Sequence, residues 1–335
     1  MTMDYPRRIS RVREYLARKK LAACLITGTP NIFYLTGLLR VPGILLVDKN
    51  ASTFFTPAMF LAESRDNPGH KGVEILAYEK FARVLKSLLK TGFIDSETTV
   101  ARLDSWRGQG RGPWVACPDF VQEIRMVKEE PELVLIRRAG RITRQVAGRV
   151  AGRLKEGVTE LDIAAEVLYE VRRAGGNAEA FAPVVAFGPN AAHAHHEPGR
   201  KRLRKNEPAL IDVGAEVAGY KSDATRTLFP CGRSRELREI FRLVREAERR
   251  CVAKARPGVC GGAVHTLAVE YFRDRGVEKY FTHGLGHGVG IEIHERPALN
   301  AASRDILRAN MVFTIEPGLY LPGVGGVRLE DTKVL

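Results

Sequence analysis

Cysteines are few in this sequence and form no recognisable motif. The chain of 335 residues contains five scattered cysteines without a Cys-x-x-Cys pair: Cys24, Cys117, Cys231, Cys251 and Cys260. This spacing argues against a zinc–thiolate site and predicts free thiols, which are typical of a reducing compartment. We therefore expect a cytoplasmic protein.

The sequence also lacks a long hydrophobic run. No stretch reaches the roughly 20 apolar residues that a membrane-spanning helix needs. The charged N-terminal segment MTMDYPRRISRVREYLARKK has no apolar centre of the kind found in secretory signals. We expect neither membrane association nor a leader. With 44% hydrophobic and 27% charged residues, the composition is that of a globular protein, and the length allows two domains.

Acidic residues are outnumbered by basic ones, which raises the question of nucleic-acid binding. The formal charge is +14, and it is densest over Arg200–Lys205, where five of six residues are basic. Such a run can bind phosphates. No RNP or zinc-finger motif accompanies it, and basic and acidic residues alternate elsewhere. We therefore interpret the run as a solvated loop and do not expect nucleic-acid binding.

The first third of the chain alternates helical and strand patterns. Ile9, Val12 and Leu16 recur on one face of a helix, and another helix is predicted over residues 80–90. Strands are predicted over residues 21–27, 43–47, 52–55, 72–78 and 98–104. The alternation predicts a small α/β domain over residues 1–125.

A second domain is predicted over residues 126–335. Its first helix begins near Pro131, a residue suited to a first helical turn, and covers residues 132–154. Thr159 and Asp162 resemble a capping box at the start of a helix over residues 160–176. Further helices are predicted over residues 234–255 and 262–275, and strands over residues 182–188, 208–216, 219–229, 311–321 and 325–335.

One stretch of the second domain combines histidines with closely spaced glycines. Residues 283–297 read HGLGHGVGIEIHERP and contain His283, His287 and His294. Glycine weakens regular elements, so a glycine-rich run indicates close backbone approach or a special turn. Histidine is suited to binding metals or transferring protons near neutral pH. The stretch is therefore either a structural loop or part of a site.

Four carboxylates of the same domain lie within apolar or β-rich segments. They are Asp212, Asp223, Glu316 and Glu330. The two aspartates are eleven residues apart and are expected on neighbouring strands of one hairpin. Buried carboxylates are costly unless they are paired or bound to metal.

Each carboxylate alone has an ordinary structural interpretation. Asp212 could be a turn residue, and Glu330 could pair with Arg328 or Lys333 on a surface strand. Together with His287, however, the four carboxylates suit a pair of first-row divalent cations with oxygen-rich coordination. Two such cations about 3.5 Å apart can promote amide hydrolysis.

These motifs resemble those of a known family of enzymes. The segments are IDVGAEVAGYKSDATRT, HGLGHGVGIEIHERP, TIEPGLY and VRLED. They resemble the pita-bread metallopeptidases, which include prolidase, aminopeptidase P and methionine aminopeptidase. The N-terminal segment LITGTPNIFYLTGL resembles the creatinase-type domain that methionine aminopeptidases lack. The resemblance implies an α/β creatinase-like domain over residues 1–125 and a pita-bread α+β catalytic domain over residues 126–335.

The resemblance also implies roles for individual residues. Asp223 and Glu330 would bridge two metals, Asp212 would complete one, and His287 with Glu316 would complete the other. The glycines would let His287 reach the metals while leaving backbone room for substrate.

The remaining roles that the resemblance implies concern the substrate. His294 would hydrogen-bond the scissile carbonyl or its oxyanion, and His195 matches a substrate-side histidine. These two histidines and Arg328 are the expected catalytic residues. His283 and Arg328 match residues that contact the proline side of the substrate. We assign no role to His193 and His196, which lie beside His195 in the sequence.

The implied activity is hydrolysis of the peptide bond that precedes proline. The cofactors would be two divalent ions (manganese, cobalt or zinc), the substrates Xaa-Pro dipeptides, and the assembly a homodimer. Aminopeptidase P activity on longer Xaa-Pro-Xaa peptides is the main alternative. A metal-free hydrolase like creatinase and a non-enzymatic binding protein are further alternatives, but such relatives do not keep all the ligands.

Overall fold

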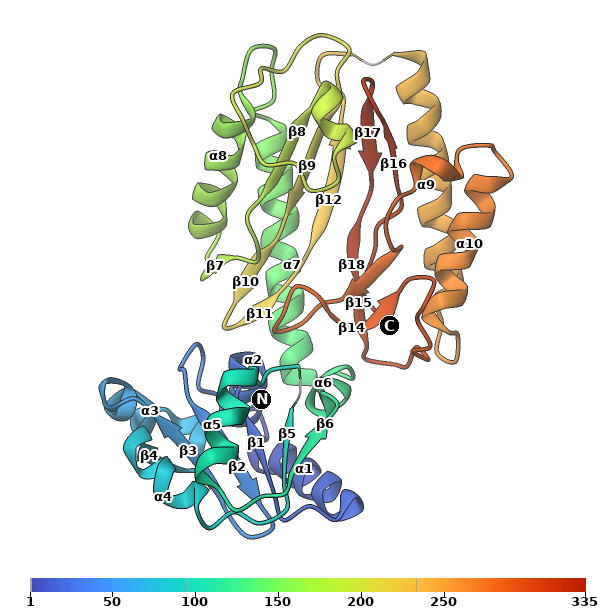
Figure 1. Ribbon diagram of the computed structural model, residues 1–335. Helices are drawn as coiled ribbons and strands as arrows, with labels where there is room; N and C mark the ends of the chain where they lie inside the picture. The colour runs from blue at the N-terminus through green and yellow to red at the C-terminus, as the bar shows by residue number, and fades with distance from the viewer. Residues whose placement is uncertain (1, 95, 233) are drawn as a thin grey trace. The chain divides into compact units, whose positions relative to one another are not determined.

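The structure is a computed structural model that describes residues 2–94, 96–232 and 234–335 (Figure 1). The chain divides into two compact units, Met1–Arg125 and Met126–Leu335. Among the described residues, none of the helices combines the length and apolarity needed to cross a bilayer. All five cysteines are free thiols.

The N-terminal unit is built on a six-stranded sheet with the order β4-β3-β2-β1-β5-β6. The β1–β2 and β2–β3 pairs are antiparallel, and the other pairs are parallel. The strands are β1 (Ala23–Ile26), β2 (Ile44–Asp48), β3 (Ser52–Thr56), β4 (Glu74–Ala77), β5 (Thr91–Ile94) and β6 (Trp114–Cys117). The helices are α1 (Tyr5–Lys19), α2 (Thr29–Thr36), α3 (Leu61–Asp66), α4 (Phe81–Leu85), α5 (Val100–Gln109) and α6 (Phe120–Arg125). As predicted, α1 buries Ile9, Val12 and Leu16 on one face.

Two predictions in this unit are wrong. Residues 98–104, predicted as a strand, lead into α5 because the Thr99 side chain caps the helix by accepting a hydrogen bond from the Arg102 amide at 3.3 Å. Such a cap contributes about 1 kcal/mol, enough to outweigh a weak strand preference. The helix predicted over residues 80–90 ends at Leu85, because the chain must turn to enter β5 at Thr91.

The C-terminal unit consists of two halves, each with two long helices packed on strands. The helices are α7 (Glu130–Ala151), α8 (Glu160–Arg173), α9 (Arg235–Lys254) and α10 (Gly261–Arg273). Figure 1 shows α7 behind the strands and α8 at their left, with α9 and α10 at their right. All four helices were predicted. Pro131 lies in the first turn of α7, and Thr159 and Asp162 form the expected capping box of α8.

The strands of the C-terminal unit form several small sheets. The first half contains the sheets β12-β9-β8 and β11-β10-β7, and the second contains β14-β13-β15-β18 and the hairpin β16-β17. Their bounds are β7 (Ala178–Glu179), β8 (Val184–Phe187), β9 (Ala209–Val213), β10 (Ala215–Val217), β11 (Tyr220–Lys221), β12 (Ala224–Leu228), β13 (Gly286–Gly288), β14 (Glu295–Leu299), β15 (Val312–Ile315), β16 (Gly318–Leu321), β17 (Gly325–Arg328) and β18 (Asp331–Val334).

Several predicted strand segments are interrupted where polar residues occur. The segment 311–321 divides at Glu316-Pro317 into β15 and β16, and the segment 325–335 divides at Leu329-Glu330 into β17 and β18. Proline cannot donate a ladder hydrogen bond, which accounts for the first break. Both breaks release a glutamate from the regular strand pairing.

The basic run Arg200–Lys205 lies in a loop. Leu203 at its centre is fully buried, Lys201 pairs with Glu207 at 2.9 Å, and Arg202 donates a hydrogen bond to the Gly157 carbonyl at 2.7 Å. Arg200, Arg204 and Lys205 are exposed. The run is therefore fastened to the protein at its centre and solvated at its ends.

Candidate active site

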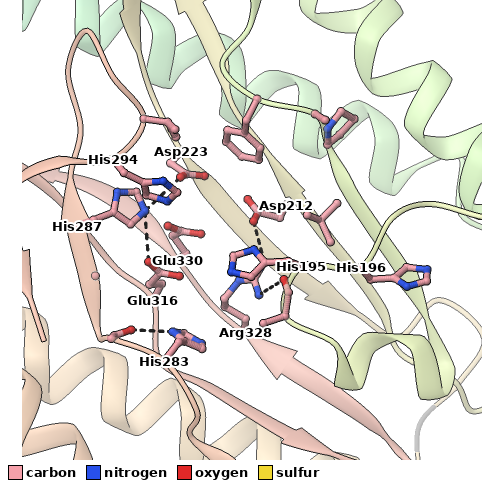
Figure 2. A pocket seen from close by; sticks show the side chains of 18 of the residues that line it. His195, His196, Asp212, Asp223, His283, His287, His294, Glu316, Arg328 and Glu330 are labelled. Carbon is pink, nitrogen blue, oxygen red and sulfur yellow. Dashed lines mark hydrogen bonds and ion pairs between the residues drawn. The ribbon is translucent and has the colours of Figure 1, made fainter. Parts of the chain in front are cut away.

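A cavity of about 500 Å³ in the C-terminal unit brings together all nine residues to which the sequence analysis gave a role. Its lining includes Asp212, Asp223, His287, Glu316, Glu330, His195, His283, His294 and Arg328 (Figure 2). Phe181, Pro183, Val184 and Ile293 add apolar surface. Acidic, basic and apolar groups therefore meet in one space of the size that small-molecule ligands occupy.

The acidic residues and His287 come from strand ends in both halves of the unit. Asp212 lies on β9, and Asp223 immediately precedes β12, which pairs with β9 in antiparallel fashion. The two aspartates therefore lie on one hairpin, as predicted. His287 is on β13, and Glu316 and Glu330 occupy the two breaks described above.

The glycines beside His287 make room for neighbouring strands. A Cβ atom on Gly286 would lie 2.1 Å from the Thr314 carbonyl oxygen, and one on Gly288 would lie 2.4 Å from the Arg296 carbonyl oxygen. Such distances are impossible for a side chain. The space beside Gly286 and Gly288 is occupied by the backbone of β15 and β14. The expectation that these glycines leave room for the substrate was therefore wrong at these two positions.

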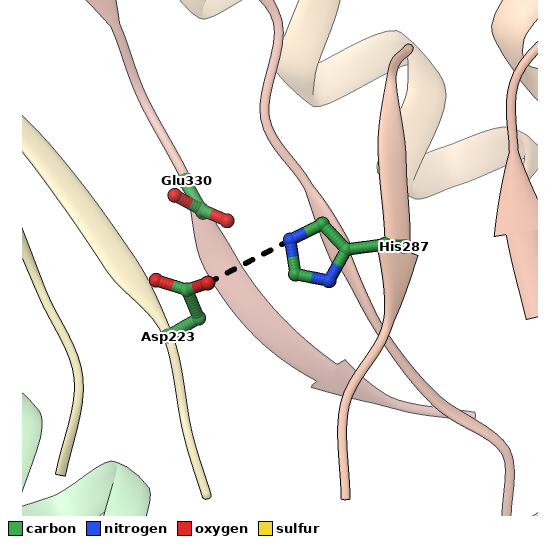
Figure 3. A group of neighbouring side chains, drawn as sticks. All are labelled: Asp223, His287 and Glu330. Atoms are coloured by element: carbon green, nitrogen blue, oxygen red, sulfur yellow. Dashed lines mark ion pairs between the residues drawn. The ribbon is translucent and has the colours of Figure 1, made fainter. Parts of the chain in front are cut away.

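Three of the residues form a compact cluster whose donor atoms could hold a metal ion. One oxygen each of Asp223 and Glu330 and one ring nitrogen of His287 lie within 4.8 Å of one another (Figure 3). His287 Nε2 is 3.6 Å from Asp223 Oδ2 and 3.4 Å from Glu316 Oε1. The ring faces two carboxylates from different strands at once.

Three buried carboxylate oxygens of the site have no hydrogen-bond partner among the described residues. They are Asp212 Oδ1, Asp223 Oδ1 and Glu330 Oε1. An unsatisfied buried oxygen is costly, and a carboxylate oxygen more so. First-row divalent cations are bound by carboxylate oxygens and imidazole nitrogen. The donor set and its unsatisfied oxygens therefore fit divalent metal ions.

The protonation states follow from burial and crowding. Burial and the charges of Glu330 and Asp212 raise the pKa of Asp223 well above its usual value. Burial raises the pKa of Glu316 to about 7, against the influence of Arg328. Burial lowers the pKa of His287 to about 4, so its ring is neutral at pH 7, the form that binds metals.

A hydrogen-bonded chain connects Arg328 with His283. Arg328 Nη2 pairs with Asp212 Oδ2 at 2.7 Å, and Nη1 donates to the Tyr320 hydroxyl at 2.9 Å. The Tyr320 hydroxyl lies 2.8 Å from His283 Nε2, and His283 Nδ1 lies 2.7 Å from the Gly284 carbonyl. Because the carbonyl can only accept, Nδ1 carries the proton and Nε2 accepts from Tyr320. Burial lowers the pKa of His283 to about 4, consistent with this neutral form.

Tyr320 was missed by the sequence analysis. It lies in the quoted segment TIEPGLY, four residues after Glu316. A tyrosine in an apolar strand has no distinctive pattern, so only the neighbouring Arg328 and His283 reveal its position. Tyr320 therefore lies within a motif used for the resemblance, but its role could not be inferred from the sequence.

His294 and His195 lie on the exposed side of the cavity. The rings of His294 and His287 are 4.2 Å apart, centre to centre, in an edge-to-face arrangement. Burial lowers the pKa of His294, so its imidazole is neutral and carries one N–H donor at pH 7. It is placed to contact a molecule in the cavity.

Glu160, also missed from sequence, anchors the loop that carries His195. This carboxylate is fully buried and accepts hydrogen bonds from the Phe187 amide at 2.8 Å and the Gly199 amide at 2.9 Å. His196 lines the cavity, but its Nε2 lies 2.9 Å from Glu160 Oε2. The structure thus gives His196 a role in fastening the loop, whereas His193 is exposed.

Two parts of the chain match models of known protein families. Residues 134–335 match the metallopeptidase family M24, and residues 8–127 match the creatinase/prolidase N-terminal domain. The chain belongs to metallopeptidase family M24. The resemblance and the two-domain fold deduced from the sequence motifs are confirmed. Membership of this metallopeptidase family implies divalent metal ions at the site.

Similarity to known proteins extends over nearly the whole chain. The chain is 30% identical to the Xaa-Pro dipeptidase of Pyrococcus horikoshii over 98% of its own length and 94% of that protein. The solved Xaa-Pro dipeptidase from Bacillus anthracis matches with a TM-score of 0.95 and 27% identity, covering 99% of this chain and 95% of that one. The X-Pro aminopeptidase from Thermotoga maritima matches with a TM-score of 0.88 and 28% identity, covering 98% and 94%.

Proposed function

We propose that this metallopeptidase hydrolyses the peptide bond preceding proline, most readily in Xaa-Pro dipeptides. The observation that carries the proposal is the cluster of carboxylates around His287, whose buried oxygens lack hydrogen-bond partners within residues 2–94, 96–232 and 234–335. The cluster opens to a cavity with apolar walls. The names of the relatives agree with this substrate class.

The ligands we assign to two divalent cations come from both halves of the C-terminal unit. Asp223 and Glu330 would be shared, Asp212 would complete one site, and His287 with Glu316 would complete the other. Each of the first three offers an oxygen that has no partner among the described residues. When bound, the ions supply Lewis acidity toward the scissile carbonyl and activate water for attack.

Arg328 orients Asp212, one of the ligands that we assign. Its guanidinium pairs with Asp212 Oδ2 and leaves Oδ1 for a cation. It also donates to Thr225 Oγ1 at 3.0 Å, and that hydroxyl donates to Glu330 Oε2 at 2.6 Å. One buried arginine therefore fixes the orientation of two carboxylates.

The histidines would act on the substrate. His294 would donate a hydrogen bond to the scissile carbonyl as negative charge develops on its oxygen, and His195 would contact the substrate from the opposite loop. Both nitrogens of His283 are engaged within the protein. Its ring face is therefore the part available to the proline ring.

Comparison of peptides tests the substrate class. Ala-Pro should be hydrolysed at least roughly 10- to 200-fold faster than Ala-Ala, because the proline ring has two more carbon atoms than the alanine side chain and a single methylene group already contributes that range in an apolar pocket. The measurement is kcat/KM for both peptides with the metal-loaded protein. Equal rates would show that the assignment to proline substrates is wrong.

A third peptide separates the two activities of the family. Under the proposal, Ala-Pro is a better substrate than Ala-Pro-Ala. Preference for the tripeptide would support aminopeptidase P activity, which the likeness to the Thermotoga maritima enzyme also allows.

A further inference from the structure

A buried ion pair lies behind the turn that carries His294. Lys128 Nζ is 2.6 Å from Glu295 Oε1, and the two side chains are only 1% and 2% exposed. Neither residue lines the cavity or belongs to the ligand set. Burial of a lysine and a glutamate to this depth costs free energy, because both charges lose their hydration.

The Glu295 carboxylate occupies the interior of the turn formed by residues 290–295. The Glu292 amide donates to Glu295 Oε2 at 3.4 Å, and the Gly290 amide donates to the Glu292 carbonyl at 3.1 Å. A Cβ atom on Gly290 would lie 2.4 Å from Glu295 Oε1, so only glycine leaves space for the carboxylate. The turn is therefore folded around this group.

Lys128 approaches the turn from a distant part of the chain. Its amide donates to the Asn310 carbonyl at 3.0 Å, and Val127 forms a β-bridge with Met311. These backbone contacts fix the lysine beside the strand that leads to Glu316. The Lys128 ammonium group is therefore held in place by contacts outside the turn. Lys128 and Glu295 are 167 residues apart in the sequence.

We propose that Lys128 is a positioning residue for His294, acting through Glu295. His294 directly precedes Glu295 and projects from the same turn toward the cavity. The ammonium group compensates the Glu295 charge and allows the carboxylate to stay inside the turn. Without it the carboxylate must seek water, which displaces the turn and the imidazole. This inference rests on the proposed role of His294.

The main test is the Lys128→Met variant. Misplacement of a catalytic group by about 1 Å can cost about a hundredfold in rate. We therefore expect kcat on Ala-Pro to fall about a hundredfold, while KM and metal content stay close to those of the unaltered protein. In a His294→Ala background, Lys128→Met should lower kcat little further, because the group that it positions is already absent.

Three comparison variants keep the test decisive. Lys128→Met/Glu295→Gln removes both charges and retains an acceptor for the Glu292 amide, so it should fold and recover most of the lost kcat. Lys128→Arg keeps the charge and should recover part of it. Arg273→Met breaks an exposed ion pair with Glu278 of the same 2.6 Å length and should leave kcat unchanged.

A readout independent of turnover separates this inference from the proposed function. In the zinc-loaded protein, the imidazole NMR signal of His294, assigned by its loss in His294→Ala, should shift in Lys128→Met and return in the double variant. An unmoved signal, or equal kcat losses in both backgrounds, would overturn the positioning role. Failure of the unaltered protein to cleave Ala-Pro would instead contradict the substrate assignment.

Discussion

Removal of divalent cations by a chelator should abolish hydrolysis of Ala-Pro, and addition of manganese or cobalt should restore it. The physical reason is the crowding of Asp212, Asp223, Glu316 and Glu330 around a common space, with three of their oxygens lacking partners among the described residues. Bound cations would supply the positive charge for which these three oxygens find no hydrogen-bond donor in the part of the chain that the structure describes. Metal analysis beside peptidase rates checks the prediction.

Stability offers a second measurement of the same binding. A cation present at 100 times its dissociation constant stabilises the folded state by about 2.7 kcal/mol. The thermal midpoint should therefore rise on cation addition and fall on chelation. A variant at the exposed His193, His193→Ala, should respond like the unaltered protein. Full activity in a demonstrably metal-free preparation would contradict the metal requirement.

Substitution of His287 and substitution of His294, whose rings pack against each other, should have different consequences. An oxyanion donor contributes about 2.7–4 kcal/mol, a hundred- to a thousandfold in turnover. His294→Ala should lose about that much in kcat and keep nearly its full metal content. His287→Ala removes a ring nitrogen that lies 3.4 Å and 3.6 Å from two of the carboxylates, so its metal content should fall and excess metal should partly rescue it.

The measurement is metal stoichiometry together with kinetics on a single substrate for both variants. The two rings touch at 4.2 Å between centres, so each variant also serves as the neighbouring control for the other. Loss of metal from His294→Ala, with metal retained in His287→Ala, would mean that the two assignments are reversed.

The resemblance of the motifs to a known family was sufficient to predict which residues meet in the cavity. Asp212 and Asp223 could be placed on one hairpin because the intervening segment allows only a short connection. The roles of Lys128, Glu160 and Tyr320 could not be predicted in this way. Each depends on partners from other elements, and a lone lysine, glutamate or tyrosine in an apolar context has no local signature.

Local structure was predictable where one preference dominated. The capping box at Thr159 and the proline at the start of α7 agree with the helical periodicity that follows. Around Thr99, strand and helix preferences compete, and the cap decided the outcome. The glycines at 286 and 288 show the same limit, because close approach was predictable but the approaching strand was not.

The division of the proposed ligands between two halves has a consequence for how the protein folds. Asp223 contacts Thr332 across 109 residues, and Asp212 pairs with Arg328 across 116. Contacts of such long sequence separation form slowly, because a large loop must close before they are made. A chain still being synthesised cannot complete the cluster before Glu330 has emerged from the ribosome. Under the proposed function, capture of the cations is therefore a late event in folding, and a nascent chain passes through a stage in which its acidic strand ends are still apart.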